Sequence, residues 1–415
     1  MKDNTSRRNF LKTVSAGTAA VSMNAVSYAR VLGANDRISI AVIGCGQRGF
    51  RAHMPGVNQY AKSENIEITA VCDPWRIRRE RAANQTKEWF GRPARKFVSY
   101  RDVMVLDDVD AVMIASCDHQ HTTHLQAAVE AKKDALCEKP LARDMQSLKE
   151  CCDAVKASGI VCQMGTQGRS RPGATGCQKL YKTGALGKVS RIEQRRNGTR
   201  PYWYSRLTEA KKSDVEWSEF LMHLPNRSFD AGLFTGWFGY RDYSDGPVPQ
   251  LASHFIDMVH YVTGATLPIS STCQGGIFTW KDEHNFTCPD QVEATWIYPE
   301  DFMVSYTTGY GNSSGNSYRF CGTQGVLDMS DQNAPKVSGE GAAKRGELRG
   351  EVAVEPVDTP EHFLNWLQCL RSRNTPNASI DAGYQHSVAM IMAVRAMDAG
   401  RRQVYDDKLR DVVAG

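Results

Sequence analysis

The sequence predicts an α/β protein built from two units. Near the N-terminus, a short apolar run rich in β-branched residues leads into a glycine-rich turn, as at the start of a parallel sheet. Apolar runs then alternate with charged, helix-like segments up to about residue 165. Beyond residue 189, predicted strands over 189–197, 271–281, 291–298, 302–309 and 317–322 lie close together in the sequence, which favours an antiparallel sheet. We therefore expect one α/β unit over 35–165 and a second over 166–415.

Residues 1–34 are predicted to be an export signal rather than part of the fold. A twin-arginine pair, Arg7-Arg8, precedes a weakly apolar stretch over 13–26 and a small-x-small site at 27–29. A chance arginine pair would not explain this order of regions, and the apolar stretch is too short to span a membrane. We expect export by the twin-arginine (Tat) pathway to the periplasm, and no membrane span in the mature protein.

The composition argues against nucleic-acid binding and against a disulfide framework. The formal net charge is +5, and no dense basic run is interleaved with aromatic residues. The chain has 12 cysteines, which lie mostly inside predicted strands and helices. Their spacing gives no credible zinc site, so we expect buried free thiols and no metal.

A complete G-x-G-x-x-G motif follows the first predicted strand. The apolar run over 38–43 leads directly into Gly44, Gly46 and Gly49. In a dinucleotide-binding turn these glycines permit the tight turn, the backbone's approach to a pyrophosphate, and close packing of helix on strand. The helix N-terminus then offers free N–H groups to the phosphates. The motif favours a Rossmann-type dinucleotide site, the alternative being a structural glycine turn in a flavodoxin-like protein.

An acidic residue ends the second predicted strand. The apolar run over 66–72 is followed by Asp73, which is placed to bind the ribose hydroxyls of NAD. Arg76 and Arg78 lie just beyond it and could accept a 2′-phosphate. We therefore expect NAD as the cofactor, with NADP as the alternative.

Three histidines lie within six residues after the central predicted strand over 111–115. The segment from Ser116 to His124 also contains His119 and His121, which invites a metal hypothesis. Yet the carboxyl end of a parallel strand is where a Rossmann fold places its ligand. We therefore expect cofactor contacts from this segment, with His124 opening the next helix, and no metal.

A short predicted strand over 134–137 delivers Glu138, Lys139 and Pro140 to the same edge of the sheet. The proline fixes the backbone and removes one donor. A lysine at this point can reach a substrate hydroxyl beside a nicotinamide. The alternative is a surface lysine paired with Glu138.

The spacing of these motifs resembles that of the Gfo/Idh/MocA oxidoreductases. The resemblance covers nearly all of the chain after residue 34 and rests on Gly44-x-Gly46-x-x-Gly49, Asp73, His124, Glu138-Lys139-Pro140, Gly165-Thr166-Gln167 and Gly184-x-x-Gly187-Lys188-Val189. It implies an N-terminal Rossmann domain, a C-terminal α/β domain with a large, mostly antiparallel sheet, a sugar, polyol or related substrate, and Lys139 as the catalytic lysine. The expected cofactor contacts are Gly44, Gly46, Gln47, Arg48, Gly49, Asp73, Ser116, His119, His124, Glu138 and Lys139.

The second unit contains an aromatic and basic insertion after its first predicted strand, which covers 189–197. Aromatic faces stack on sugar rings, and arginine supplies directed hydrogen bonds. An irregular loop packed on its own aromatic residues is the alternative for any one residue. The expected substrate contacts from this insertion are Arg200, Tyr202, Trp203 and Trp237.

A predicted helix over 250–261 carries the second catalytic candidate. His254 matches the position of the family's catalytic histidine, and Asp257 matches a common downstream acid that we expect to bind substrate. Family members often carry an aspartate where this chain has Gln250, and an amide cannot take a proton as a carboxylate does. Lys139 and His254 are therefore expected to carry more of the proton transfer.

The export signal shapes the predicted function. Outside the inner membrane no recycling NAD pool is expected, so we expect a sugar or glycoside oxidoreductase that keeps and regenerates its cofactor. An NAD-dependent glycoside hydrolase, which oxidises its substrate transiently, is the first alternative, and a non-catalytic sugar-binding protein is the second. By resemblance we also expect a homo-oligomer, either a dimer or a tetramer.

Overall fold

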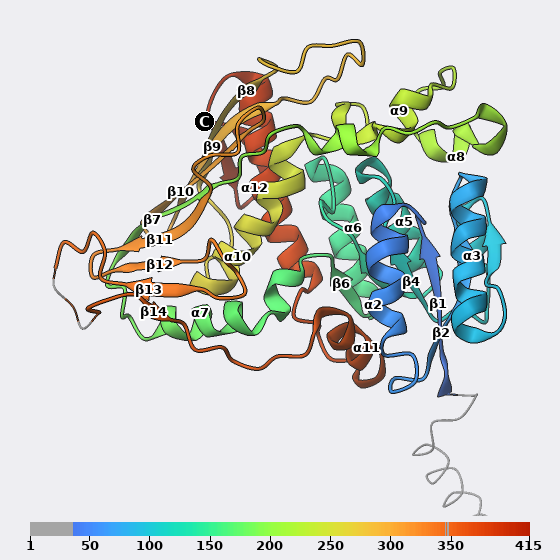
Figure 1. The fold of residues 1–415 in the computed structure, drawn as a ribbon, viewed down its shortest axis with the longest axis horizontal. Coiled ribbons are helices and arrows are strands. Elements are labelled where there is room, and N and C mark those ends of the chain that lie inside the picture. The colour runs from blue at the N-terminus through green and yellow to red at the C-terminus, as the bar shows by residue number, and fades with distance from the viewer. Residues whose placement is uncertain (1–35, 345, 347) are drawn as a thin grey trace, which may run out of the picture.

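The computed structural model describes residues 36–344, 346 and 348–415, so the predicted export signal over 1–34 lies outside the described residues. The chain forms two sheets, each flanked by helices (Figure 1). Within the described residues, no helix combines the length and apolarity that crossing a membrane requires.

The first sheet has six parallel strands, and its strand order is that of a doubly wound Rossmann fold. The central strands are buried along their length because helices cover both faces. In spatial order the strands are β3 (Arg95–Phe97), β2 (Ile66–Cys72), β1 (Ile38–Ile43), β4 (Ala111–Ile114), β5 (Asp134–Cys137) and β6 (Cys162–Met164).

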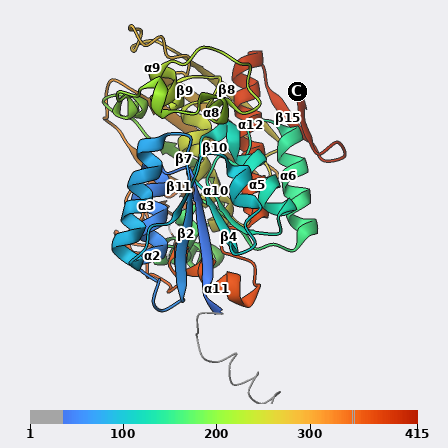
Figure 2. The same ribbon diagram turned by 90° about the vertical axis from the view of Figure 1, so that its right-hand side faces the viewer.

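Alternate side chains of β1 enter two separate cores, as the two-residue period of a strand requires. Ile40 and Val42 pack with one set of helices, whereas Ala41 and Ile43 pack with the other set. The first set comprises α2 (Met54–Asn58), α3 (Arg76–Phe90) and the returning helix α11 (His362–Ser372), and the second comprises α5 (His121–Glu130) and α6 (Met145–Ser158). Figure 2 shows α2 and α3 on the opposite side of the sheet from α5 and α6.

The second sheet has ten strands. Every neighbouring pair is antiparallel except β7 with β10, which confirms the predicted mostly antiparallel sheet. In spatial order the strands are β14 (Val352–Ala353), β13 (Lys336–Ser338), β12 (Val326–Asp328), β11 (Ser317–Gly322), β7 (Val189–Arg195), β10 (Phe302–Gly309), β9 (Gln291–Tyr298), β8 (Ser270–Gly276), β15 (Gln403–Asp406) and β16 (Asp411–Ala414).

One face of this sheet packs on helices and the other is open. Trp296 and Val304 are fully buried beneath the helices, whereas Ile297 and Met303, which pair across β9 and β10, are about two-fifths exposed. The covering helices are α7 (Pro172–Lys182), α10 (Ser253–Thr263) and α12 (Ile380–Ala399).

The aromatic insertion, residues 196–247, crosses from the second sheet to the first domain. Its short helices α8 (Trp217–Leu221) and α9 (Ala231–Thr235) lie above α3 in Figure 1. Val215 pairs with Trp75 in an isolated bridge, and Arg76 donates to Asp214 at 2.7 Å. The insertion therefore packs against the carboxyl end of β2.

The predicted buried thiols are confirmed. Ten of the 12 cysteines are buried and all 12 are free. Only Cys117 and Cys321 are partly exposed.

Candidate active site

The glycine motif forms a concave turn that side chains would fill. Gly44 has a φ of +91°, and a Cβ there would lie 2.6 Å from the carbonyl of Ala115. A Cβ on Gly49 would lie 1.9 Å from the Gly44 oxygen. At Gly46, by contrast, a Cβ would meet nothing nearer than Arg78 Nη1 at 3.4 Å. The turn thus keeps open space at its second glycine, where a dinucleotide's diphosphate would lie.

Asp73 fastens this turn to the end of β2. Its Oδ2 accepts from the backbone N–H of Cys45 and its Oδ1 from that of Trp75, both at 2.8 Å. Burial raises the pKa of the carboxyl, which is only 3% exposed. The carboxylate therefore fixes the turn's geometry and also lines the cleft beside it.

We call this cleft the nucleotide cleft. The first domain supplies one wall of it, and the aromatic insertion supplies the opposite wall. The first-domain residues include Gly44, Gly46, Gln47, Arg48, Asp73, Arg78, Ser116 and His124, and the insertion residues include Arg206, Phe220, Phe234, Trp237 and Phe238. A bound dinucleotide would therefore lie between two walls rather than on an open edge.

The predicted histidine segment divides in two. His124 Nδ1 lies 2.9 Å from Ser116 Oγ, both side chains line the nucleotide cleft, and burial lowers the pKa of His124 to about 3. His119 instead lies among aromatic rings of the insertion, where its Nε2 donates to the carbonyl of Phe220 at 2.9 Å. His119 therefore links the insertion to the first domain. It lines neither the nucleotide cleft nor the wider cleft that adjoins it.

Glu138 is the centre of a buried ionic cluster. Its Oε1 accepts from Arg48 Nε at 2.5 Å and lies 2.8 Å from His53 Nε2. Although burial opposes ionisation, these neighbours hold the pKa of Glu138 well below its ordinary value. A Cβ on Gly165 would lie 2.6 Å from the carboxyl carbon, which explains the glycine there. The cluster fixes the loop that carries Lys139.

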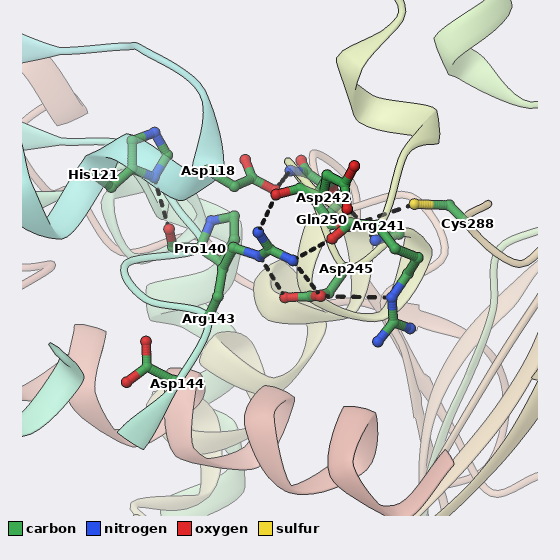
Figure 3. Close-up of polar contacts among 12 residues, drawn as sticks. Asp118, His121, Pro140, Arg143, Asp144, Arg241, Asp242, Asp245, Gln250 and Cys288 are labelled. Atoms are coloured by element: carbon green, nitrogen blue, oxygen red, sulfur yellow. Dashed lines mark hydrogen bonds and ion pairs between the residues drawn. The ribbon is translucent and has the colours of Figure 1, made fainter. Parts of the chain in front are cut away.

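Lys139 lines a second, wider cleft, which shares Arg48 and Ser116 with the nucleotide cleft. Its Nζ donates to the backbone oxygen of Gln250 at 2.7 Å and to the side-chain Oε1 at 3.2 Å. The amide of Gln250 in turn donates to Asp118 Oδ2 (Figure 3). Burial lowers the pKa of Lys139 to about 8. The lysine is therefore poised to exchange a proton near neutral pH.

Gln250 connects Lys139 indirectly to a carboxylate, that of Asp118. Asp118 is buried and its charge raises the pKa of Lys139, against the larger effect of burial. Gln250 lies in a π-helical turn (Val248–Ala252) that precedes α10. The sequence indicated a lost carboxylate at Gln250, but gave no sign that Asp118, 132 residues away, contacts it.

Arg143 holds the turn before Gln250 against the lysine loop. It donates to both carboxylate oxygens of Asp245 at 2.9 Å and to the carbonyl of Asp242 at 2.7 Å (Figure 3). On the other side, His121 Nδ1 donates to the carbonyl of Pro140 at 2.7 Å. Neither Arg143 nor His121 was predicted as a site residue, because no sequence pattern indicates that Arg143 contacts Asp245 or that His121 contacts Pro140.

The wider cleft, of about 580 Å³, is called here the open cleft. Lys139 and His254 both line it, together with Arg200, Tyr202 and Trp237 from the insertion. The Tyr202 hydroxyl is buried without a hydrogen-bond partner in the described residues. The structure thus brings three of the four predicted insertion contacts together with both predicted catalytic residues.

The remaining two predicted substrate contacts lie elsewhere. Trp203 is 1% exposed and packs inside the aromatic cluster of the insertion. Asp257, one helical turn from His254, accepts from Arg169 Nε at 2.9 Å. Burial would raise the pKa of Asp257, but Arg169 and His386 lower it to about 2. Asp257 therefore carries a charge that is already paired.

His254 differs from the other histidines of the site in having no hydrogen bond among the described residues. It lines the open cleft and also a neighbouring cleft on the sheet side. Burial and the charge of Lys139 lower its pKa well below the ordinary value. The ring is therefore neutral at physiological pH and carries a free nitrogen able to accept a proton.

Comparison with curated proteins gives partial matches. Levoglucosan dehydrogenase of Pseudarthrobacter phenanthrenivorans is 25% identical over 60% of this chain and 48% of its own length. Inositol 2-dehydrogenase 3 of Saccharopolyspora erythraea is 32% identical over 43% of this chain and 51% of its own length. A glycosyl hydrolase family 109 protein of Shewanella baltica (strain OS155) is 29% identical over 39% of each chain. The matches thus span about half or less of these relatives.

Solved structures share the fold over most of the chain. Aldose-aldose oxidoreductase from Caulobacter crescentus, complexed with glycerol, superposes with a TM-score of 0.66 at 19% identity, covering 88% of this chain and 99% of that one. Levoglucosan dehydrogenase in complex with NADH gives a TM-score of 0.67 at 16% identity, covering 88% and 98%.

Two family models match consecutive parts of the chain. Residues 38–166 match the oxidoreductase family with an NAD-binding Rossmann fold, and residues 179–405 match the C-terminal alpha/beta domain of the same family. These matches confirm the predicted family and the nicotinamide-binding character of the first domain. The chain therefore belongs to the Gfo/Idh/MocA oxidoreductase family.

Proposed function

We propose that this protein is an NAD(P)-dependent oxidoreductase that acts on a sugar, a polyol or a glycoside. The observation that carries the proposal is the position of Lys139, which lines the open cleft, and this cleft shares Arg48 and Ser116 with the nucleotide cleft. Its pKa of about 8 lets it give or take a substrate proton near neutral pH.

The first domain fits a nicotinamide dinucleotide. The turn at Gly44, Gly46 and Gly49 leaves the space that a diphosphate needs, and Ser116 and His124 line the same cleft. When bound, the nicotinamide accepts a hydride from a carbinol carbon or returns it. The chain's own residues hold the reacting hydroxyl, take its proton and exclude water.

Two side chains share the proton transfer in this proposal. Lys139 contacts the substrate hydroxyl and polarises it, while Gln250 fixes the direction of its Nζ. His254 faces the same cleft as a neutral ring with a free nitrogen, so it accepts or relays the proton. The insertion supplies aromatic faces for a sugar ring through Tyr202 and Trp237.

The matched relatives support a carbohydrate substrate. Two of them are dehydrogenases of levoglucosan and inositol, which are polyhydroxylated rings. The open cleft offers hydrogen-bonding groups suited to such rings, including Arg200 and the unpartnered hydroxyl of Tyr202.

We favour NAD over NADP. Asp73 lines the nucleotide cleft and its carboxylate would repel a 2′-phosphate while accepting ribose hydroxyls. Of the two nearby arginines, Arg76 is already paired with Asp214 and Glu80, and only Arg78 faces the cleft.

We also propose that the cofactor stays bound through turnover. The insertion walls the nucleotide cleft with Phe220 and Phe234, so release requires it to move away from the first domain. Retention agrees with Tat-dependent export to the periplasm, where no recycling pool is expected. A second substrate, or the product of an internal oxidation, would then regenerate the cofactor.

An NAD-dependent glycoside hydrolase is the second candidate. The partial match to a glycosyl hydrolase family 109 protein favours it. In this scheme the sugar is oxidised transiently, which acidifies the adjacent C–H. A base removes that proton, the glycosidic bond breaks by elimination, water adds, and the ketone is reduced again. The free nitrogen of His254 is placed to serve as that base.

We further propose that the protein is a dimer or tetramer assembled through the open face of the second sheet. Ile297 and Met303 lie side by side on that face and are substantially exposed. Mass photometry of the purified protein tests this proposal, which predicts an even multiple of the chain mass and a monomer for the double variant Ile297→Lys/Met303→Lys.

A single-turnover experiment tests the main proposal. The protein loaded with NAD is mixed with candidate sugars, and bound reduced nicotinamide is followed by its fluorescence. Signal with at least one sugar, lost in Lys139→Ala although sugar binding persists, is the expected result. A Lys139→Ala variant that behaves as the wild type would instead indicate a sugar-binding protein. Release of the glycoside's leaving group distinguishes the hydrolase from the net oxidoreductase.

A further inference from the structure

A third cleft, of about 490 Å³, lies against the second sheet and adjoins the open cleft. The two share His254 and Arg196 as lining residues. We call it the outer cleft. The reaction proposed above uses none of its other residues, which come from β7, from the start of β11, from the loop after β12, from α10 and from the segment before α7.

Three residues that line the outer cleft each have one buried polar atom without a hydrogen-bond partner among the described residues. Gln194 Oε1, Asp257 Oδ2 and the Tyr318 hydroxyl are all buried without a hydrogen bond in the described residues. Asp257 and Tyr318 are each only 1% exposed. Unsatisfied buried polar groups are costly, and a polyhydroxylated ligand offers both donors and acceptors to satisfy them.

The charge of the outer cleft is unbalanced. Arg195 and Arg196 line it, and neither forms an ion pair within residues 36–344, 346 and 348–415. Arg171 donates to the neutral amide of Gln332 at 2.5 Å. The carboxylate in this cleft, Asp257, is already paired with Arg169. The cleft therefore presents positive charge that no described side chain neutralises.

The cofactor does not account for this charge. Arg195 and Arg196 do not line the nucleotide cleft, whose arginines are Arg48, Arg78 and Arg206. An arginine fork binds carboxylates and phosphates through paired, charge-assisted hydrogen bonds. The arginines of the outer cleft thus match an anionic group on the substrate.

Resting on the proposed function, we propose that the outer cleft is a second carbohydrate subsite that takes an anionic sugar unit. The other unit of the same saccharide lies in the open cleft beside Lys139. Arg196, which lines both clefts, binds the anionic group at their junction. The anion is a carboxylate, as in a uronic acid, or a phosphate ester.

Calorimetric titration of the purified protein with matched disaccharides tests this inference. Cellobiose, cellobiouronic acid and cellobiose 6′-phosphate share a backbone and differ in the charged group at C6 of the non-reducing unit. We expect an acidic disaccharide to bind at least about tenfold more tightly than cellobiose, because a charge-assisted arginine contact is worth about that much. The carboxylate and phosphate arms show which anion the cleft prefers.

Arginine variants locate the effect. Arg196→Gln and the double variant Arg195→Gln/Arg196→Gln should bring the affinity ratio of acidic to neutral disaccharide close to one. Arg191→Gln is the matched control, since Arg191 lies on the same strand, pairs with Glu193 and lines none of the three clefts. It should keep the wild-type ratio.

The outcomes separate this inference from the proposed function. Equal affinity for acidic and neutral disaccharides, or no binding of either, overturns the subsite even if the protein holds nicotinamide and oxidises a neutral sugar. Preference for the acidic disaccharide in a protein that binds no nicotinamide supports the subsite and overturns the oxidoreductase. A ratio unchanged by the double variant also contradicts the inference.

Discussion

The two sides of the catalytic junction differ in how their polar groups are satisfied. On the first-domain side, Asp73 accepts two backbone N–H groups and Glu138 binds both Arg48 and His53. On the side of the second domain, Arg196 forms no ion pair and His254 forms no hydrogen bond within the described residues. These groups on the first-domain side are already hydrogen-bonded or ion-paired within the protein, whereas those on the second-domain side remain available to bind a ligand.

This difference separates side chains that fix the geometry of the site from side chains that bind the ligand. A buried carboxylate with two partners fixes backbone geometry, and its loss is felt as lost stability. A side chain without a partner in a cleft contributes little to folding but is free to bind substrate. Lys139 lies between these classes, because Gln250 directs its Nζ while the cleft leaves it access.

Among the substitutions that test this comparison, Lys139→Ala should have the largest effect. We expect kcat to fall about 10³-fold, since general acid–base catalysis contributes between about 10² and 10⁴. Thermal unfolding and nicotinamide content should stay near those of the wild type. Lys179→Ala, at an exposed lysine outside the clefts, is the control. Unchanged turnover in Lys139→Ala would remove the lysine from the mechanism.

His254→Asn tests the second side. Asparagine keeps polarity but cannot take a proton, so we expect about a 10²-fold loss of kcat with unchanged stability. Steady-state kinetics and a melting curve measure the two effects. The control is His223→Asn at an exposed histidine. A fall in stability without a fall in kcat would place His254 among the structural groups.

Glu138→Gln tests the first side. The substitution leaves Arg48 and His53 without their carboxylate, so we expect a loss of about 3 kcal/mol in the free energy of unfolding. Because the folded pKa of Glu138 is depressed, its stabilisation is present above about pH 4 and is lost as the pH falls through the folded value. Chemical denaturation at several pH values measures both. Equal stabilities at pH 7 would contradict the account.

Asp118→Asn tests whether the charge of Asp118 acts on Lys139. The charge of Asp118 raises the pKa of Lys139, so its removal should lower that pKa from about 8. The acidic limb of the kcat/KM profile, which reports deprotonation of the lysine, should move down by about one pH unit. Asp144→Asn changes an exposed residue on the loop that carries Lys139, and it should leave the limb in place. If the acidic limb does not move in Asp118→Asn, the charge of Asp118 does not affect the pKa of Lys139.

The smallest expected effect concerns the insertion. Asp214→Asn removes a partly exposed ion pair with Arg76, which should change the stability little because solvent screens such pairs. Release of nicotinamide should nevertheless quicken a few-fold, because this pair fastens the insertion over the nucleotide cleft. Stopped-flow fluorescence measures the release rate. Asp108→Asn, which removes an exposed pair with Arg95, is the control.

The first-domain side of the junction was also predicted more completely from the sequence than the second-domain side. The two-residue and glycine patterns place β1, β2 and β5 at the predicted residues, since buried strands must be apolar and the turn must lack side chains. The predicted strand over 271–281 ends instead at Gly276, and β3 and β12 to β16 were not predicted. Those strands are short, so they carry few periodic residues.

Long-range contacts account for what the sequence did not predict in the site. Gln250 suggested only a missing carboxylate, but its two ends connect Lys139 to Asp118 across more than 100 residues. His119 and Trp203 had the residue types of ligand contacts, yet packing placed both among the aromatic rings of the insertion. A residue type indicates what a side chain can do, whereas the fold decides what it faces.

The central claim is that the chain holds a nicotinamide cofactor beside Lys139. The most direct test is to purify the mature protein without added nucleotide, denature it, and identify any nucleotide released. A cofactor that stays bound through turnover should be released as NAD(H) at close to one molecule per chain. Finding no nicotinamide, together with no binding or activity when NAD or NADP is added, would contradict the central claim.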